Sequence, residues 1–393
     1  MKTKIFFATA LLATSLCFSC DYFKTTSKNV EPENNTDLVL NTLPGSSGTK
    51  IQVALLLDTS NSMDGLIDQA KSRLWNIVNT LTTLKYEGKN PTIEIALYEY
   101  GNDGLSSSSN FIRQVTPLST DLDLISEKLF SLRTNGGNEY CGAVIQDAAQ
   151  KLEWGNEKGN MKLLYIAGNE SFAQGSVNYK EAINDALKKD IYVNTIFCGN
   201  NSEGINSNWK DGADKGQGKY FNIDSNEKVQ YIATPYDDKI YKCNERLNGT
   251  YLSYGRQGIE KKEMQVAQDK NAESVSSSNY AERAVSKSKA VYKNESWDLV
   301  DKVKDDKKAL DKIKKEELPK ELQNKSTQEI KVIVETKTKE RETIQKEMAD
   351  LAKKRQEFID VEAKKQKVKD DLGNAIASSI KDFAKLKGYT FEK

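Results

Sequence analysis

The sequence predicts an α/β fold with a doubly wound, mostly parallel sheet, followed by a charged and mainly α-helical C-terminal region. One observation behind this prediction is that apolar runs of strand length alternate with amphipathic helical patterns, which indicates a parallel sheet with helices on both faces. Another is that the first run, IQVALLLD (51–58), is almost continuously apolar, which is typical of a strand buried on both faces. The third is a change of composition after residue 256, because more than half of the residues in 301–370 are charged.

The α/β domain is predicted to cover residues 50–255, and its elements follow from hydrophobic periodicity. After the strand 51–58, apolar side chains recur at helical spacing from Leu66 to Leu81. Further apolar runs predict strands, and runs with helical spacing predict the helices between them. In order, we expect strands at 92–100 and 111–118, helices at 121–132 and 142–153, a strand at 161–168, a helix at 177–189, a strand at 191–199, a short strand near 220–223 and a closing helix within 226–255.

The C-terminal region, residues 256–393, is predicted to contain a long helix that begins with a capping-box pattern at Ser326 and Glu329. A 3,4 spacing can be laid through ten positions of this helix, of which six are apolar. That is poor for a coiled coil and fair for a solvated helix or helical hairpin. Two alternatives stay open, a charged spacer with i,i+4 pairs and a coiled coil that binds a partner. The ten positions are Ile330, Val334, Lys337, Arg341, Ile344, Met348, Leu351, Arg355, Phe358 and Glu362.

Four residues before this helix are too apolar for a linker. Tyr292 is followed closely by Trp297, Leu299 and Val300. We expect them to dock onto another part of the protein, because apolar side chains of this size gain free energy by leaving water.

Residues 1–19 are predicted to be a signal peptide. Lys2 and Lys4 precede an apolar run at 5–18 that is too short to span a bilayer. The following polar stretch, residues 20–49, is predicted to be a flexible tether. No later apolar run is long enough to cross a membrane.

The junction Ser19-Cys20 resembles the end of the lipobox of bacterial lipoproteins. The resemblance implies that cleavage leaves Cys20 as a lipidated N-terminus, which would anchor the protein to the periplasmic or surface face of the bacterial cell envelope without spanning the membrane. Leu16 lies one place further from Cys20 than is usual. Ordinary secretion with cleavage nearby is the alternative.

The charge balance and the lack of histidine exclude several functions. The 58 Lys and Arg residues almost cancel the 57 Asp and Glu residues, so no basic field favours nucleic acid as a partner. The chain has no histidine. This excludes histidine-based catalytic triads, His-rich zinc sites and imidazole pH switches.

The loop after the first strand carries three oxygen-bearing side chains, Asp58, Ser60 and Ser62. Ligands of open α/β sheets bind at the carboxyl ends of the strands, which is where this loop lies. A carboxylate and two hydroxyls suit a hard divalent cation such as Mg²⁺, Mn²⁺ or Ca²⁺. The alternative role of the two serines is to cap the following helix.

In this context residues 51–225 resemble a von Willebrand factor type A (VWA) domain, and DTSNS (58–62) matches the first segment of its metal-ion-dependent adhesion site. The resemblance implies that the two serine hydroxyls bind the cation directly and that Asp58 binds it directly or through water. It also implies an open coordination position that takes an acidic group from a protein partner.

The family completes this site with a threonine and an aspartate from two later loops, and the sequence departs from both. The loop NGGNEYCGA (135–143) offers Asn138 or Glu139, or Thr134 just before it, in place of the threonine. The loop IAGNES (166–171) has Gly168 where the aspartate would fall, with Asn169 or Glu170 beside it. These replacements are oxygen donors. The predicted metal ligands are Asp58, Ser60, Ser62, Glu139 and Asn169.

Export would leave three cysteines, Cys141, Cys198 and Cys243, in surroundings that permit disulfides. The VWA resemblance implies that Cys141 and Cys198 lie at the same edge of the sheet. We therefore predict a disulfide between them, with Cys243 unpaired. Three buried free thiols are the alternative.

The sequence thus predicts a non-catalytic, envelope-anchored protein that binds a protein partner through a divalent cation. A structural envelope protein with a degenerate metal site is the first alternative. A metal-dependent hydrolase is less favoured, since the chain has no histidine, no Gly-rich phosphate loop and no nucleophile elbow. One metal ion with oxygen ligands could still activate water.

Overall fold

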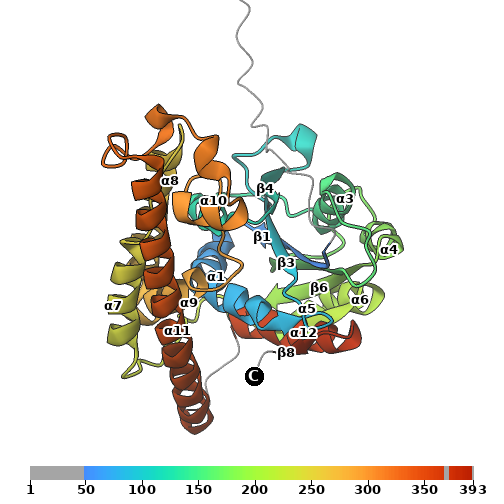
Figure 1. The fold of residues 1–393 in the computed structure, drawn as a ribbon. Coiled ribbons are helices and arrows are strands. Elements are labelled where there is room, and N and C mark those ends of the chain that lie inside the picture. Colours follow the sequence, from blue (N-terminus) through green and yellow to red (C-terminus); the bar gives the residue numbers. More distant parts are fainter. Residues whose placement is uncertain (1–47, 367–370, 392–393) are drawn as a thin grey trace, which may run out of the picture. The chain divides into compact units, whose positions relative to one another are not determined.

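The central feature of the computed structural model, which describes residues 48–366 and 371–391, is a six-stranded sheet with the order β4-β3-β1-β5-β6-β7 (Figure 1). Strand β4 pairs antiparallel with β3, and the other pairs are parallel. The predicted α/β fold class is confirmed. The strands are β1 (Lys50–Asp58), β3 (Thr92–Tyr100), β4 (Ile112–Ser119), β5 (Met161–Gly168), β6 (Ile191–Cys198) and β7 (Gln217–Ile223).

The predicted signal peptide, the lipidation site Cys20 and nearly all of the predicted tether lie outside the described residues. The described residues on both sides of the predicted boundary at residue 255 belong to one compact unit.

Helices cover both faces of the sheet, which explains the unbroken apolar run of β1 from Val53 to Leu57. Val53 and Leu55 point to one core, and Ala54 and Leu56 point to the other. The first core includes side chains of α1 (Asp64–Thr82), α2 (Leu122–Ser131) and α12 (Leu372–Leu386). The second includes side chains of α3 (Cys141–Lys151), α4 (Tyr179–Lys188) and α6 (Trp209–Lys215).

Several elements have no counterpart among those expected from the sequence. They are short or depend on distant partners, so local periodicity does not reveal them. Helix α12 belongs to the region predicted as charged, yet one of its faces completes the first core, and Arg73 of α1 forms a buried ion pair with Asp371 just before it (2.5 Å). The other unexpected elements are η1 (Asn61–Met63), η2 (Ser107–Ser109), α5 (Asn201–Asn206), α6, and a small antiparallel pair of β2 (Leu84–Lys85) with β8 (Thr390–Phe391).

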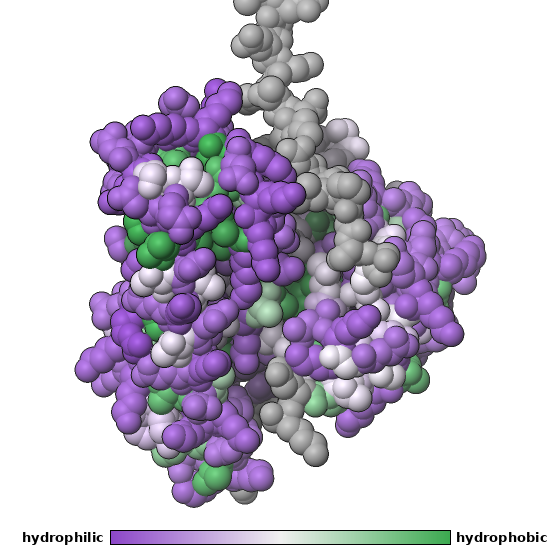
Figure 2. Space-filling view, viewed as in Figure 1, coloured by the Kyte–Doolittle hydropathy of each residue, from purple (hydrophilic) through white to green (hydrophobic). Residues whose placement is uncertain are grey.

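The C-terminal region is helical, as expected, and it packs against the α/β domain. Its long helix α11 (Thr327–Gln366) begins at the predicted capping box: Glu329 accepts from the backbone N–H of Ser326 (2.8 Å), and Ser326 accepts from that of Glu329 (3.3 Å). Figure 2 shows a mostly hydrophilic outer surface over these helices. The other elements here are α8 (Gly258–Val275), α9 (Ser277–Lys287), α10 (Leu299–Asp305), η3 (Ala309–Asp311) and η4 (Lys315–Glu317), and α7 (Asp237–Asn248) is the helix expected within 226–255.

The expectation of a solvated spacer is wrong for one face of α11. Ile344 and Met348 of the 3,4 spacing are fully buried. Two charged positions of that spacing are buried as well. Arg341 pairs with Asp298 (2.8 Å), and Arg355 pairs with Asp237 of α7 (2.8 Å). These buried ion pairs hold α11 against its own chain, where a coiled coil would use apolar residues.

The docking predicted for Tyr292, Trp297, Leu299 and Val300 is confirmed, because all four are buried. The hydroxyl of Tyr292 donates to Asp123 of α2 (2.5 Å), so this segment reaches across to the α/β domain.

A buried charge cluster joins the helices of the two regions. Arg283 of α9 is fully buried and pairs with Asp123 of α2 (2.6 Å) and with Asp269 of α8 (3.0 Å). Lys287 also pairs with Asp269 (2.7 Å). Burial alone would raise the pKa of Asp269, but Lys287 and Arg283 hold that pKa below its usual range. The positive and negative charges within this cluster therefore balance one another.

Removing the central cation of this cluster should destabilise the fold. Arg283→Met leaves two buried carboxylates without that partner, so we expect the free energy of unfolding to fall by about 3–5 kcal/mol. The measurement is urea unfolding followed by circular dichroism. Arg246→Ala, which breaks the exposed pair with Glu347 (2.7 Å), is the control and should cost less than about 1 kcal/mol. Equal losses for the two variants would contradict the importance given to the cluster.

Candidate functional site

The candidate site begins at Asp58, the last residue of the central strand. It is fully buried, and its Oδ1 accepts a hydrogen bond from the backbone N–H of Ser60 (2.8 Å). Its Oδ2 is buried and has no hydrogen-bond partner among the described residues. A carboxylate oxygen that is neither solvated nor hydrogen-bonded lowers the stability of the fold. Binding a proton or a cation at this atom would remove that cost.

Two further loops of the sheet edge meet this one. The hydroxyls of Ser60 and Ser62 lie 3.4 Å apart. Asn169, just after β5, donates from its amide nitrogen to the Ser62 hydroxyl (3.1 Å). Ser60 is buried and Ser62 is exposed, so the row of oxygens leads from the interior to solvent.

Glu139 closes the site from the loop before α3. It is 7% exposed, and Gly101 lies between it and Asp58: a Cβ on Gly101 would be 2.9 Å from both Asp58 Oδ1 and Glu139 Cγ. A side chain at Gly101 would therefore push the two acids apart. The structure brings together all five residues predicted as metal ligands. We call Asp58, Ser60, Ser62, Glu139 and Asn169 the rim cluster.

Two other candidate ligands from the sequence, Thr134 and Glu170, lie outside the rim cluster. The Thr134 hydroxyl bonds to the carboxylate of Asp64 at the start of α1. Glu170 is exposed and adds negative charge near Asp58 and Glu139. Neither contact makes Thr134 or Glu170 part of the row of oxygens.

Tyr100 is a site residue that sequence reasoning missed. It ends β3 directly beside Asp58 in the parallel register, and its hydroxyl donates to the carbonyl of Ala167 (3.0 Å). A Cβ on Gly168 would lie 2.5 Å from the Tyr100 hydroxyl and 2.9 Å from Asp58 Oδ2. Tyr100 thus occupies the space that a side chain at position 168 would need, which explains the glycine. The available signal was a tyrosine ending the strand next to Asp58.

Electrostatics at the rim cluster favour added positive charge. Burial raises the pKa of Asp58 to about 7, hydrogen bonds from Ser60 oppose the rise, and the nearby carboxylates of Glu139 and Glu170 add to it. Burial also raises the pKa of Glu139, with Glu170 contributing. A divalent cation would relieve both the desolvation and the repulsion.

The donor set fits a hard cation only if neutral oxygens take part. No three acidic or thiol side chains of residues 48–366 and 371–391 lie close enough to form a metal site by themselves. The rim cluster supplies two carboxylates, two hydroxyls and an amide oxygen. Such an all-oxygen set suits Mg²⁺, Mn²⁺ or Ca²⁺.

The predicted disulfide is wrong, because Cys141, Cys198 and Cys243 are all buried free thiols. Cys141 packs in the core that contains α3, and its sulfur lies 3.9 Å from the Tyr100 hydroxyl. Cys198 packs in the core on the opposite face of the sheet. Cys141 begins α3 and Cys198 ends β6, but their side chains lie in the cores on different faces of the sheet.

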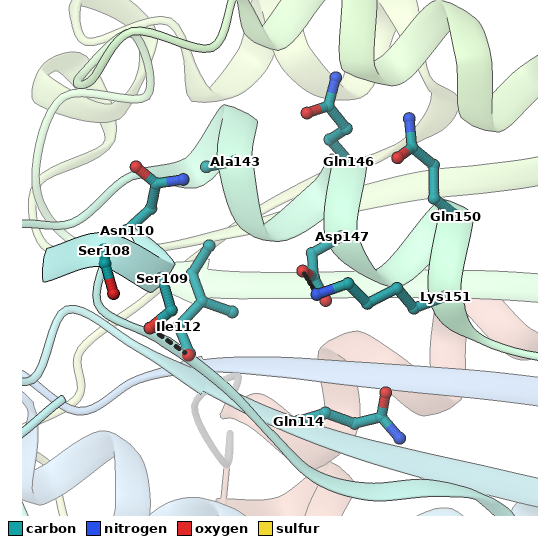
Figure 3. Close-up of a pocket in the computed structure, with 10 residues that line it drawn as sticks. All are labelled: Ser108, Ser109, Asn110, Ile112, Gln114, Ala143, Gln146, Asp147, Gln150 and Lys151. Atoms are coloured by element: carbon teal, nitrogen blue, oxygen red, sulfur yellow. Dashed lines mark hydrogen bonds and ion pairs between the residues drawn. The ribbon is translucent and has the colours of Figure 1, made fainter. Parts of the chain in front are cut away.

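A separate polar pocket of about 350 Å³ lies between α3 and the edge strand β4. Figure 3 shows Asp147 and Lys151, which form an ion pair (2.5 Å), among the side chains that line it. The amides of Gln114, Gln146 and Gln150 add hydrogen-bonding groups. No residue of the rim cluster lines this pocket, so it is a second polar feature of the same domain.

Comparisons with known proteins bear on the segment that carries the rim cluster. Residues 52–235 match the model of the von Willebrand factor type A domain. A search of curated proteins found no match. The chain is similar to a solved structure of the conserved hypothetical protein BatB from Bacteroides thetaiotaomicron, with 15% identity over 44% of this chain and 90% of that one and a TM-score of 0.34.

The chain is also similar to proximal thread matrix protein 1 from the mussel byssus. That structure has zinc in its metal-ion-dependent adhesion site (MIDAS) motif. The identity is 12%, over 46% of this chain and 43% of that one, and the TM-score is 0.34. These identities and TM-scores are too low to say what this chain binds.

The raised pKa of Asp58 predicts how the stability of the metal-free protein depends on pH. The folded protein holds this proton up to a pH of about 7, whereas the unfolded chain releases it near its ordinary value of 3.8. Between these values the free energy of unfolding should therefore fall as the pH rises, by at most about 1.4 kcal/mol per pH unit.

The measurement is urea unfolding in a chelator at several pH values, for the wild type and for Asp58→Asn. Asparagine does not titrate, so the difference between the two proteins should change across this window and be constant above it. A difference that does not vary with pH would show that Asp58 is ionised in the folded protein.

The free thiols give a second prediction. Burial raises the pKa of all three, to about 11 for Cys243, so little thiolate forms at neutral pH. We expect iodoacetamide to leave Cys141, Cys198 and Cys243 unmodified in the native protein and to modify each of them after unfolding without a reductant. Peptide mass mapping is the measurement. A peptide containing Cys141 linked to Cys198 would contradict it.

Proposed function

We propose that this protein is a non-catalytic binding protein whose rim cluster holds a divalent cation for a protein partner. The match of residues 52–235 to the model of the von Willebrand factor type A domain supports this proposal. The observation that carries this proposal is the buried Oδ2 of Asp58, which has no hydrogen-bond partner among the described residues and lies beside Gly168 at the end of β5.

Asp58, Ser60 and Ser62 would hold the cation from the first loop, and Glu139 and Asn169 would complete the site from the other two. The cation supplies positive charge to an acidic group of the partner at an open position. Asn169 and Ser62 belong to the solvent side of the cluster, which leaves the partner a way of approach. Buried Asp58 and Glu139 would fix the cation from below.

We also propose a lipid at Cys20 that places the protein on the bacterial cell envelope. The support is the sequence of the first twenty residues, with its positive start, apolar run and Ser19-Cys20 junction. In the described part of the chain, no helix is long and apolar enough to cross a membrane.

A structural envelope protein with a degenerate site is a second candidate, favoured by Tyr100. Its hydroxyl fills the space beside Gly168, the position where the family aspartate would fall. In that case Asp58 would simply carry a proton, which its pKa of about 7 permits under mildly acidic conditions.

Calorimetric titration of the full chain with Mg²⁺, Mn²⁺ and Ca²⁺ tests the proposal. We expect one ion to bind per chain, and Ser60→Ala with Ser62→Ala to weaken binding at least about tenfold, because both hydroxyls are lost. Ser108→Ala with Ser109→Ala, two exposed serines of η2, is the matched control and should bind as the wild type does.

The other outcomes separate the alternatives. No heat from any of the three ions would favour the structural protein. Binding that survives the loss of both Ser60 and Ser62 would place the ion elsewhere. Turnover of a phosphate ester that depends on the metal would favour the hydrolase.

A further inference from the structure

The opposite edge of the sheet carries a basic pocket that the proposed function does not use. Its lining comes from the loop before β5, the start of β5, the segment between α4 and β6, and the end of α12, and its volume is about 530 Å³. We propose that this pocket binds a phosphate group, carried by a membrane lipid or by a soluble phosphate ester.

The central group is Lys162, the second residue of β5. It is only 4% exposed and lines the pocket. Among the described residues its ammonium has no hydrogen-bond or ion-pair partner, which is unusual for a lysine buried to this extent. Burial lowers the pKa of Lys162. An anion in the pocket would supply the missing partner.

The acids of the lining, Glu157 and Asp190, offset only part of the positive charge in the pocket. Five lysines line the pocket against two acids, Glu157 and Asp190, which leaves an excess of three positive charges. Both acids act on Lys162 by their charge and oppose the lowering of its pKa, but their direct contacts go elsewhere: Asp190 pairs with Lys387 (2.7 Å), and Glu157 accepts from Asn160 (2.7 Å). The remaining lining lysines are Lys158, Lys188 and Lys189.

Of the three remaining lysines, Lys188 and Lys189 have partners among the described residues and Lys158 does not. Lys188 pairs with Asp185 (2.8 Å), and Lys189 donates to the carbonyl of Ala149 (2.8 Å). Lys158 is exposed, and no described residue bonds to its ammonium. Lys158 and Lys162 therefore offer two uncommitted ammonium groups, one at the mouth of the pocket and one inside.

The C-terminal end of the described chain holds the pocket wall in place. The Tyr389 hydroxyl donates to the carbonyl of Gly159 (2.8 Å), and the Tyr389 ring packs on Tyr86 with centroids 5.1 Å apart. Gly159 has φ +95°, and a Cβ there would lie 2.8 Å from the Tyr86 hydroxyl. This close packing fixes the Tyr86 hydroxyl, a further hydrogen-bond donor, in the lining.

This lining suits a phosphate. Ammonium groups are point charges that phosphates accept well, and the charge excess favours an anion with more than one negative charge. The volume exceeds that of one phosphate, so an attached group can enter. Leu386 lines the same pocket and is 71% exposed, so an apolar group on the ligand would find a contact there.

The test uses the full chain and its Lys162→Met variant. We expect inorganic phosphate and glycerol 3-phosphate to raise the melting temperature of the wild type above its value in sodium chloride of equal ionic strength. In calorimetry, Lys162→Met should weaken binding of at least one probe more than about tenfold. Lys158→Met changes an exposed position and should weaken binding of the same probe less than Lys162→Met does. It replaces Lys162→Met in the test if that variant does not fold. Lys239→Met, an exposed lysine of α7, is the control.

Vesicles separate the two sources of phosphate. Sedimentation with phosphatidylcholine vesicles, with and without phosphatidylglycerol, should show binding that depends on phosphatidylglycerol and on Lys162 if the ligand is a lipid headgroup. Binding of the small phosphates alone, dependent on Lys162, identifies a soluble ester. The proposal is overturned if neither kind of probe binds, or if Lys162→Met and Lys239→Met respond as the wild type does. The rim cluster is not involved in either result, so the metal proposal stands or falls separately.

Discussion

The burial of β1 on both faces is the constraint on which the arrangement of this protein depends. A strand with apolar cores on either side has no place for charge along its length, so polar chemistry collects where the strands begin and end. Asp58 lies at the carboxyl end of β1, and the basic pocket lies at the other edge, around the start of β5. Carboxylates gather at the first edge, and in the pocket at the other edge lysines outnumber carboxylates.

Buried ion pairs also help to explain how the C-terminal helices are attached to the α/β domain. Apolar side chains of α9, α11 and α12 pack in the first core, and buried ion pairs add to this attachment. Arg283, Arg341 and Arg355 are each buried, and each meets at least one carboxylate. Guanidinium groups suit this role because their fixed array of donors satisfies several acceptors at once. An ion pair of this kind tolerates few alternative partners, so it selects one docking geometry.

Hydrophobic periodicity predicted most strands and helices of the domain, because each is long and its pattern is local. The sequence also predicted that the five residues of the rim cluster lie close together: Asp58, Ser60 and Ser62 from the loop after the first strand, and Glu139 and Asn169 from the VWA resemblance. Tyr100 was missed because its role depends on Gly168, 68 positions away by number and adjacent only in space. The disulfide failed for a related reason: sequence placed Cys141 and Cys198 at the same edge, but not on opposite faces.

The buried face of α11 shows a further limit of prediction from a local sequence pattern. The ten positions of its 3,4 spacing included the residues that are buried, but Arg341 and Arg355 looked like interruptions of a seam. Their partners Asp298 and Asp237 are far away in the sequence, and no local pattern links them. Charged residues at regular seam positions are thus ambiguous until the opposite surface is known.

The end of the described chain returns to its beginning. The Tyr389 hydroxyl donates to the carbonyl of Lys50 (3.4 Å), and β8 pairs with β2, so residues more than 300 positions apart complete the same part of the fold. Contacts this distant in sequence make folding slow, because a long loop must close before they form. While it is being synthesised the chain lacks its last helix, so the first core stays open until α12 has emerged. The second core contains no side chain of α12, so one face of the sheet can pack during synthesis while the other waits for the C-terminal helix.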